Sequence, residues 1–276
     1  MPSKPPTTHH PGLDPAQVAA ALTDAAERVC TLLESVADPS TRVAATPGWT
    51  VAELARHVAF LPDYYRGAPR GKFGWTPDAA TMPQVNTRNI ETLRELSPAA
   101  AGSHLRRAMA DYAPQVRAAT PAEHPFPAHA GALMNTVQLG AVGVGELEVH
   151  GHDLAGTLHR PWAIPPAHAA MVLRGVEPLL PRWLSDGRRR HDRTDYEIRI
   201  RGNLGTHRWR FDKGQMVIDP PGRWKPDVVL SADPSAALLV FYRRTSQWSA
   251  IARGRLLAWG PQPWKSLGLV GRFHIP

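Results

Sequence analysis

Two carboxylate–histidine pairs fall within one short stretch of the chain. Glu146 precedes His150 by four residues, and Glu148 precedes His152 by the same spacing. Residues four apart on an α-helix project side by side from one face. Carboxylate oxygens and imidazole nitrogens are ligands of zinc and of non-haem iron. Either pair could therefore supply two ligands of a single metal ion.

The surrounding residues favour Glu146 and His150 as the pair that faces the protein interior. The helical face through 146 and 150 also carries large apolar side chains, namely Leu139, Val142, Val149 and Leu154. The face through 148 and 152 carries small residues with little surface to bury, namely Ala141, Gly145, Gly151, Ala155 and Gly156. The periodicity therefore predicts that Glu148 lies on the less buried side.

His57 is the candidate third ligand, because it is the one histidine on a predicted helical stripe of Leu54, Val58 and Leu61. Two imidazoles and one carboxylate with an open position are typical of catalytic zinc and of the facial triad of non-haem Fe(II). On spacing alone the simpler interpretation is favoured. In it, His57 and His150 are core histidines that bond to carboxylates, since Glu–His pairs at this spacing are common on helices.

The elements that would position these residues form an all-helical bundle. Helix caps and apolar spacing predict helices over 15–37, 51–61, 86–96, 98–116 and 133–158. The second begins with a Thr50–Glu53 capping box and should end before Pro62. Residues 62–83 and 120–130 are predicted to be loops, because they are rich in proline and lack a clear period.

The pattern changes after one further helix, which is predicted to run from Pro166 to about Leu184. Strands are expected around 196–200, 209–211, 216–218, 228–230 and 251–259, with a helix from Asp233 through Tyr242. The chain is thus predicted to be an α+β protein of two domains, 14–185 and 194–276. Residues 1–13 are expected to form a disordered tail.

Composition narrows the class of protein. The chain has 276 residues, 43% of them apolar and 20% charged, as is usual for globular proteins. A single cysteine, Cys30, excludes an internal disulfide, and its place beside the apolar stripe of the first helix predicts a small core residue. No secretion signal and no run of ~18 apolar residues is visible. We therefore expect a cytoplasmic protein without a membrane partner, either a monomer or a small homo-oligomer.

The chain is basic, with a net charge of +8 and a pI of about 10.1. The positive charge is densest between Arg182 and Lys213 and includes the run 188–190. Alternation with apolar residues places Arg199 and Arg201 on the outer face of a strand. Because no nucleic-acid-binding motif accompanies this charge, we predict no nucleic-acid partner and favour a solvated face or an anionic small molecule.

Two segments resemble motifs of a known family. Residues 47–58, Pro-Gly-Trp-Thr-Val-Ala-Glu-Leu-Ala-Arg-His-Val, resemble the opening motif of the mycothiol-dependent maleylpyruvate isomerase family. Residues 146–155 resemble its second motif, Glu-x-x-x-His followed by Asp-Leu. The resemblance covers most of residues 14–272 and implies a DinB-like four-helix bundle followed by a sterol-carrier-like α+β domain. It also implies that His57, Glu146 and His150 are the metal ligands.

The resemblance implies further site residues as well. An arginine of the C-terminal domain is expected near the active site, and Arg243 and Arg244 are the catalytic candidates. The run 242–244 departs from the glycine-containing turn that is usual in the family. His152 stands where a bulky apolar or aromatic residue is expected, so it could add a polar group. His152 and Asp153 are therefore the candidate cofactor-binding residues.

The function implied is metal-dependent activation of a small thiol. The thiolate is the nucleophilic form of a thiol, and the only cysteine of the chain lies in no reactive motif, so an external thiol is expected. The resemblance implies that this thiol is mycothiol, and the expected ion is Zn²⁺ or another divalent metal. The reaction would be cis–trans isomerisation or S-transfer on a small anionic electrophile. The alternatives are a non-catalytic ligand-binding or stress-response protein, and a non-haem iron enzyme that uses the same three ligands.

Overall fold

The computed structural model describes residues 12–71, 81–120, 123–185 and 193–274. The chain divides into two compact units, one formed by Leu13–Arg182 and the other containing Trp183–Ile275. Each unit is described by itself below. Most of the predicted tail and the basic run 188–190 lie outside the described residues.

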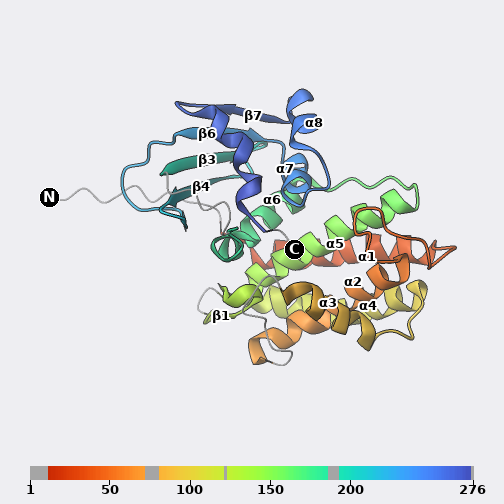
Figure 1. Ribbon diagram of the computed structural model, residues 1–276. Coiled ribbons are helices and arrows are strands. Elements are labelled where there is room, and N and C mark those ends of the chain that lie inside the picture. Colours follow the sequence, from red (N-terminus) through yellow and green to blue (C-terminus); the bar gives the residue numbers. More distant parts are fainter. Residues whose placement is uncertain (1–11, 72–80, 121–122, 186–192, 275–276) are drawn as a thin grey trace. The chain divides into compact units, whose positions relative to one another are not determined.

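The helical unit is a four-helix bundle with two added helices (Figure 1). The bundle helices are α1 (Pro15–Glu34), α2 (Val51–Gly67), α4 (Pro98–Ala118) and α5 (Thr136–Thr157). Helix α1 packs on α4 and α5, and α2 packs on the same two helices. The added helices are α3 (Met82–Thr92), which packs on α2, and α6 (Pro166–Gly175), which packs on α5. Among the described residues, no helix has the combination of length and hydropathy that a membrane crossing requires.

Side-chain caps fix where the bundle helices begin. The Asp14 carboxylate accepts hydrogen bonds from the first turn of α1, and the Ser97 hydroxyl does so for α4. The predicted capping box of Thr50 and Glu53 is confirmed at the start of α2. A second box, which the sequence analysis missed, joins Asn135 and Gln138. It sets the start of α5 three residues later than predicted.

Several predicted helix ends were wrong. Helix α3 lies four residues earlier than predicted, and the ends of α2 and α6 differ by more. Helix α2 continues through Pro62 to Gly67. A proline costs one backbone hydrogen bond in a helix interior, but burial of Tyr64 and Tyr65 beyond it favours the helical path. Conversely, α6 ends at Gly175 rather than near Leu184. The chain continues as a 3₁₀ helix, η4 (Glu177–Arg182), which contains Pro181.

The prediction for Glu148 was also wrong, because its side chain is fully buried. Its Oε1 accepts hydrogen bonds from Arg28 Nη1 of α1 at 2.9 Å and from His168 Nδ1 of α6 at 2.8 Å. The small residues on this face of α5 leave room for neighbouring elements to approach closely. A Cβ added to Gly145 would lie 2.6 Å from Val172, and one added to Gly151 would lie 2.2 Å from the ring of Trp162.

The C-terminal unit is built on a five-stranded sheet in the order β5-β4-β3-β6-β7. Its strands are β3 (Thr194–Ile200), β4 (Gly205–Asp212), β5 (Gln215–Ile218), β6 (Val228–Ala232) and β7 (Leu256–Trp259). Strands β3 and β6 are parallel, and the other neighbours are antiparallel. Two short helices complete the unit, α7 (Pro234–Phe241) and α8 (Gln247–Ala252). The predicted α+β class is confirmed. Arg199 lies on the face opposite the buried Tyr196 and Ile198, as the alternation predicted.

We expect Gly151→Ala to lower the free energy of unfolding by ~1–3 kcal/mol, because the new methyl group would overlap the Trp162 ring. That ring is covered by the Arg28 guanidinium at 4.0 Å, which limits its movement. Gly156→Ala is the matched control in the same helix, since nothing lies within 4 Å of its added Cβ. It should be neutral or stabilising by up to ~1 kcal/mol. If urea unfolding gave the same change in the free energy of unfolding for Gly151→Ala and Gly156→Ala, contact with Trp162 would not be the cause.

Candidate metal centre

The structure brings the three predicted ligands together inside the bundle. His57 comes from α2, and Glu146 and His150 come from adjacent turns of α5. Glu146 Oε2 lies 3.4 Å from His57 Nε2 and 3.3 Å from His150 Nε2. One ligand atom from each residue falls within 4.8 Å of the other two. The three side chains therefore point at one another rather than at separate core partners.

Trp49 forms an aromatic wall beside the two histidines. Its ring centroid lies 4.8 Å from that of His57 and 5.9 Å from that of His150. The tryptophan occupies the turn just before α2, where its backbone N–H donates to Thr46. In the sequence this residue was named only within the 47–58 motif, with no role at the site. The aromatic residue placed directly before the histidine-bearing helix was the available signal for a role at the site.

Asp153 lies behind His150 and orients its ring. The His150 Nδ1 is 3.3 Å from Asp153 Oδ2, and the Asp153 side chain is fully buried. Donation from Nδ1–H to this carboxylate leaves Nε2 directed at Glu146 and able to act as a ligand. Metal-binding histidines are commonly held in this way. The geometry thus favours a positioning role for Asp153 over direct cofactor contact. His152 Nδ1 lies 3.8 Å from the other oxygen, Asp153 Oδ1, and the His152 side chain is half-buried.

Burial and neighbouring charges shift the pKa values of the groups at the centre. Burial alone would raise the pKa of Glu146, but the bonds from His150 and His57 hold it well below its usual range. Burial would lower the pKa of His150, but the carboxylates of Asp153 and Glu146 raise it to about 9. Burial lowers the pKa of His57 despite the Glu146 charge. Without an ion, the site therefore holds a proton on His150 at neutral pH.

A fourth histidine, His129, was missed by the sequence analysis. It lies in the predicted 120–130 loop, on the 3₁₀ turn η3 (His129–Gly131). Burial lowers its pKa to about 4, and the Glu146 and His57 charges act on it in opposite directions. His129 is thus a neutral imidazole within electrostatic reach of the centre. Its neighbour Ala130 has a φ of 53°, a left-handed conformation that is rare for alanine.

The donor set at this centre fits a divalent metal. Two imidazole nitrogens and one carboxylate oxygen suit Zn²⁺ or Fe²⁺ and leave coordination positions open. Asp24, Glu148 and His168 form a second group with similar spacing. There, however, the Arg28 guanidinium already lies 2.9 Å from Glu148. The second group is therefore an ion-pair cluster with its own permanent cation.

Arg243 and Arg244 lie in the C-terminal unit, directly after α7. Arg243 Nη2 donates to the Phe273 carbonyl at 3.0 Å, and Arg244 Nη1 donates to the Tyr242 carbonyl at 2.9 Å. Both line a hollow of about 400 Å³ together with Ser246 and Gln247. Arg243 has a φ of 59°. This arginine thus takes the left-handed conformation that a glycine in this turn would adopt more readily.

Comparisons with known proteins agree with this architecture. A family model described as the mycothiol maleylpyruvate isomerase N-terminal domain matches residues 11–155, over half of the chain. The crystal structure of the mycothiol-dependent maleylpyruvate isomerase is 18% identical, covers 84% of this chain and 89% of that chain, and has a TM-score of 0.50. A mutant of that enzyme is 16% identical over 81% of this chain and 86% of that chain, with a TM-score of 0.48. No curated protein matches the chain in sequence.

We expect the purified protein to bind one divalent ion, and His57→Ala, Glu146→Gln and His150→Ala to lose stoichiometric binding. Because the His150 proton must leave first, affinity should fall about tenfold per pH unit from pH 8 to pH 6. Calorimetry in buffers of different ionisation enthalpy should detect one proton released at pH 7. His124→Ala, at an exposed histidine, is the control. Full binding by the three ligand variants would exclude this site.

Cys30 should be inert, as its predicted core position implies. It is fully buried, and its thiol donates to the Gly102 carbonyl at 3.2 Å. Burial raises its pKa to about 11, so the nucleophilic thiolate form is scarce at neutral pH. We therefore expect iodoacetamide to label the native protein at least 100-fold more slowly than the urea-unfolded chain. Comparable labelling rates would make Cys30 a candidate nucleophile.

Proposed function

This chain belongs to the mycothiol maleylpyruvate isomerase family, because the family model matches residues 11–155. From that membership we propose that it is a metal-dependent enzyme that uses mycothiol. The proposed reaction is cis–trans isomerisation, or S-transfer, on a small anionic electrophile. The observation that carries the proposal is the convergence of His57, Glu146 and His150 on one point of the bundle interior. Zn²⁺ is the proposed ion.

The protein's own residues prepare the site for this chemistry. His57, Glu146 and His150 would hold the ion, and Asp153 keeps the His150 Nε2 directed toward it. Trp49 covers the two imidazole rings and limits access of water from its side. When bound, a divalent ion would lower the pKa of a thiol at an open position, so that the nucleophilic thiolate form would be available at neutral pH with its proton released to solvent.

An external thiol is needed because the chain supplies no reactive sulfur. Cys30 is the only cysteine in the sequence, and it is buried with a raised pKa. The open coordination positions would therefore be filled from outside the protein. In this proposal mycothiol provides the sulfur, and the family assignment is the reason for preferring it over other small thiols.

Arg243 and Arg244 are the proposed binding groups for an anionic substrate. A guanidinium can hold a carboxylate through two parallel hydrogen bonds. In each of these side chains one nitrogen donates to a backbone carbonyl, Arg243 Nη2 to Phe273 and Arg244 Nη1 to Tyr242. These bonds limit the rotamers of both arginines. The hollow that they line holds polar groups of Ser246 and Gln247 as well.

We expect the zinc-loaded protein with mycothiol to isomerise maleylpyruvate, or to conjugate a thiol acceptor, and His150→Ala to lower kcat/KM at least 1000-fold. Arg243→Ala and Arg244→Ala should be tested separately. The variant that removes the substrate-binding arginine should raise KM about tenfold and leave the metal content unchanged. Arg223→Ala, at an exposed arginine of the same unit, is the control. Thiol binding without product would indicate a ligand-binding protein. Iron with oxygen-dependent turnover would indicate a non-haem iron enzyme.

A further inference from the structure

The C-terminal unit exposes an unusual concentration of apolar surface within 20 residues. Of the eight large apolar side chains exposed among the described residues, six lie between positions 248 and 267. We call them the apolar edge: Trp248, Ile251, Leu257, Trp259, Trp264 and Leu267. The three tryptophans are 60, 42 and 64% exposed. At ~250 Å² per indole they alone present roughly 400 Å², the size of the largest apolar patch on a typical monomer.

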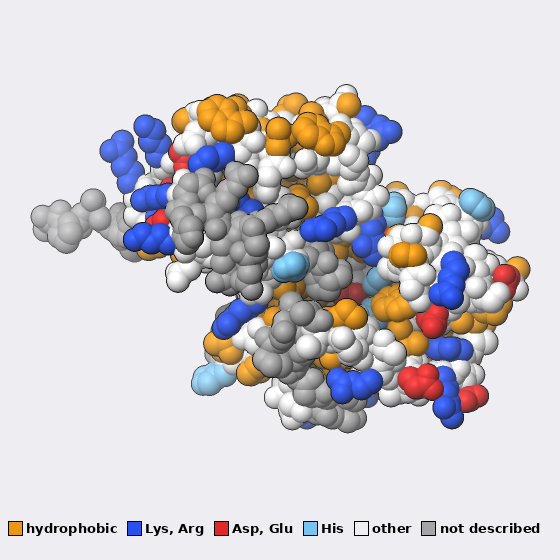
Figure 2. Space-filling view, in the orientation of Figure 1, with side chains coloured by type: hydrophobic (Ala, Val, Ile, Leu, Met, Phe, Trp, Pro, Cys, Tyr) orange, Lys and Arg blue, Asp and Glu red, His pale blue; other side chains and the backbone are white. Residues whose placement is uncertain are grey.

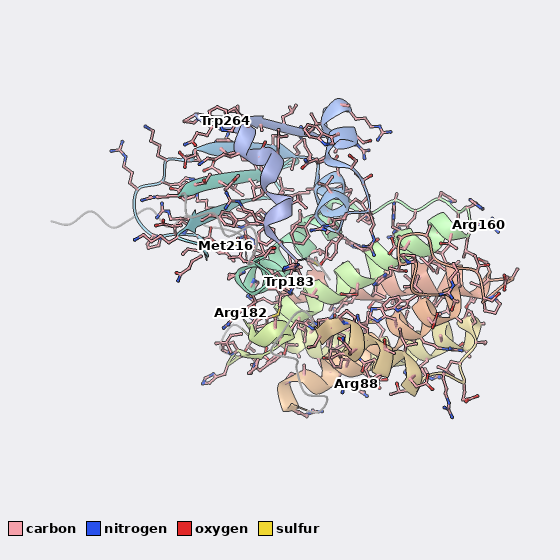
Figure 3. The ribbon with its side chains drawn as sticks, viewed as in Figure 1. Arg88, Arg160, Arg182, Trp183, Met216 and Trp264 are labelled. Atoms are coloured by element: carbon pink, nitrogen blue, oxygen red, sulfur yellow. The ribbon has the colours of Figure 1, made fainter. Side chains whose placement is uncertain are left out.

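These side chains come from elements that adjoin one another. Trp248 and Ile251 belong to α8, Leu257 and Trp259 to the edge strand β7, and the other two to the 3₁₀ helix η6 (Pro263–Gly268). Strand β7 contacts both α8 and η6, and the Gln247 amide donates to the Leu267 carbonyl at 3.2 Å. In Figure 2, hydrophobic side chains gather along this edge of the unit, and Figure 3 labels Trp264 there.

The chain segment that carries the apolar edge is basic. Residues 234–276 contain six arginines and lysines and no aspartate or glutamate. Arg253 and Arg255 are exposed between α8 and β7, and the Arg199 guanidinium lies 5.7 Å from the Trp259 ring. Carboxylates of other elements that meet this segment are paired or hydrogen-bonded, and Glu197 forms an ion pair with the Arg199 guanidinium at 2.7 Å. Asp227 accepts from Gln262, and Asp233 caps α7.

We propose that the apolar edge is a contact site for an anionic lipid bilayer. Tryptophan favours the interface between headgroups and acyl chains, and arginines beside it attract anionic headgroups. A bilayer supplies both apolar material and negative charge across its surface, which this mixture of indoles and guanidiniums requires. A second copy of the chain would bring two copies of the basic segment 234–276 together, and the repulsion between their arginines opposes that arrangement.

A peripheral contact of this kind needs no membrane span. The sequence predicted no membrane partner because it contains no long apolar run, and that reasoning concerns spanning segments only. Amphipathic surfaces bind membranes through buried apolar area together with attraction to anionic lipids. Such binding is reversible and weakens as salt screens the charges.

The test is co-sedimentation of the full-length, metal-loaded protein with vesicles. We expect binding to phosphatidylcholine vesicles that contain 30% phosphatidylglycerol, with at least tenfold weaker binding to pure phosphatidylcholine and in 0.5 M salt. Trp248→Ser with Trp264→Ser should weaken binding to the anionic vesicles at least tenfold, and Arg253→Glu with Arg255→Glu should do the same. Circular dichroism establishes that each variant is folded.

Two controls separate the apolar edge from general properties of the chain. Leu133→Ser removes an equally exposed apolar side chain from the helical unit, and Arg107→Glu with Arg117→Glu reverses the same amount of charge on α4. Both should bind like the wild type. No binding to anionic vesicles at low salt overturns the proposal. Binding of the tryptophan variant to anionic vesicles as strong as that of the wild type also overturns it. A third contrary result is a wild type that does not bind lipid but forms a concentration-dependent dimer, which the tryptophan variant does not form.

Discussion

A carboxylate can be buried in a helical bundle only if its charge is compensated, and α5 places three buried or partly buried carboxylates within eight residues. Glu146 is compensated by His57 and His150, Asp153 by His150, and Glu148 by Arg28 and His168. Leaving any of these charges uncompensated would cost several kcal/mol. The arrangement of α1, α2 and α6 around α5 is therefore tied to the hydrogen-bonding partners that they carry, Arg28, His57 and His168.

The two sides of α5 differ in the kind of cation that they use, and this difference separates structure from chemistry. Arg28 cannot lose its proton, so the Glu148 cluster is permanently neutralised and closed to a metal. At Glu146 the compensating groups are imidazoles, which can release a proton and offer a lone pair instead. A divalent ion can replace the proton that His150 otherwise holds. The same helix is thus anchored on one side and able to bind metal on the other.

The sequence predicted that His57, Glu146 and His150 meet in space, and the structure brings them together. Helical periodicity and capping are local properties, so they indicated the inward faces, and the family resemblance indicated the set of three. His57 and the Glu146–His150 pair were both found from residues close to them in the chain. The environment of Glu148 could not be found in this way, since its partners lie 120 and 20 residues away. Glycine and alanine were taken as a sign of a face with little to bury. In this bundle they allow close approach, of helix α6 at Gly145 and of the Trp162 ring, in the segment between α5 and α6, at Gly151.

Backbone strain adds a last constraint on how the proposed site residues are held. Ala130, next to His129, and Arg243 both have left-handed φ values that cost free energy for residues with a Cβ. A glycine at either position would relieve that cost. At position 243 it would also remove a guanidinium that lines the polar hollow of the C-terminal unit. Strain of this kind persists only where the surrounding contacts enforce it, and for Arg243 one such contact is the bond to the Phe273 carbonyl. The turn after α7 therefore trades a favourable backbone for a fixed positive charge, which is the property that recognition of an anionic substrate requires.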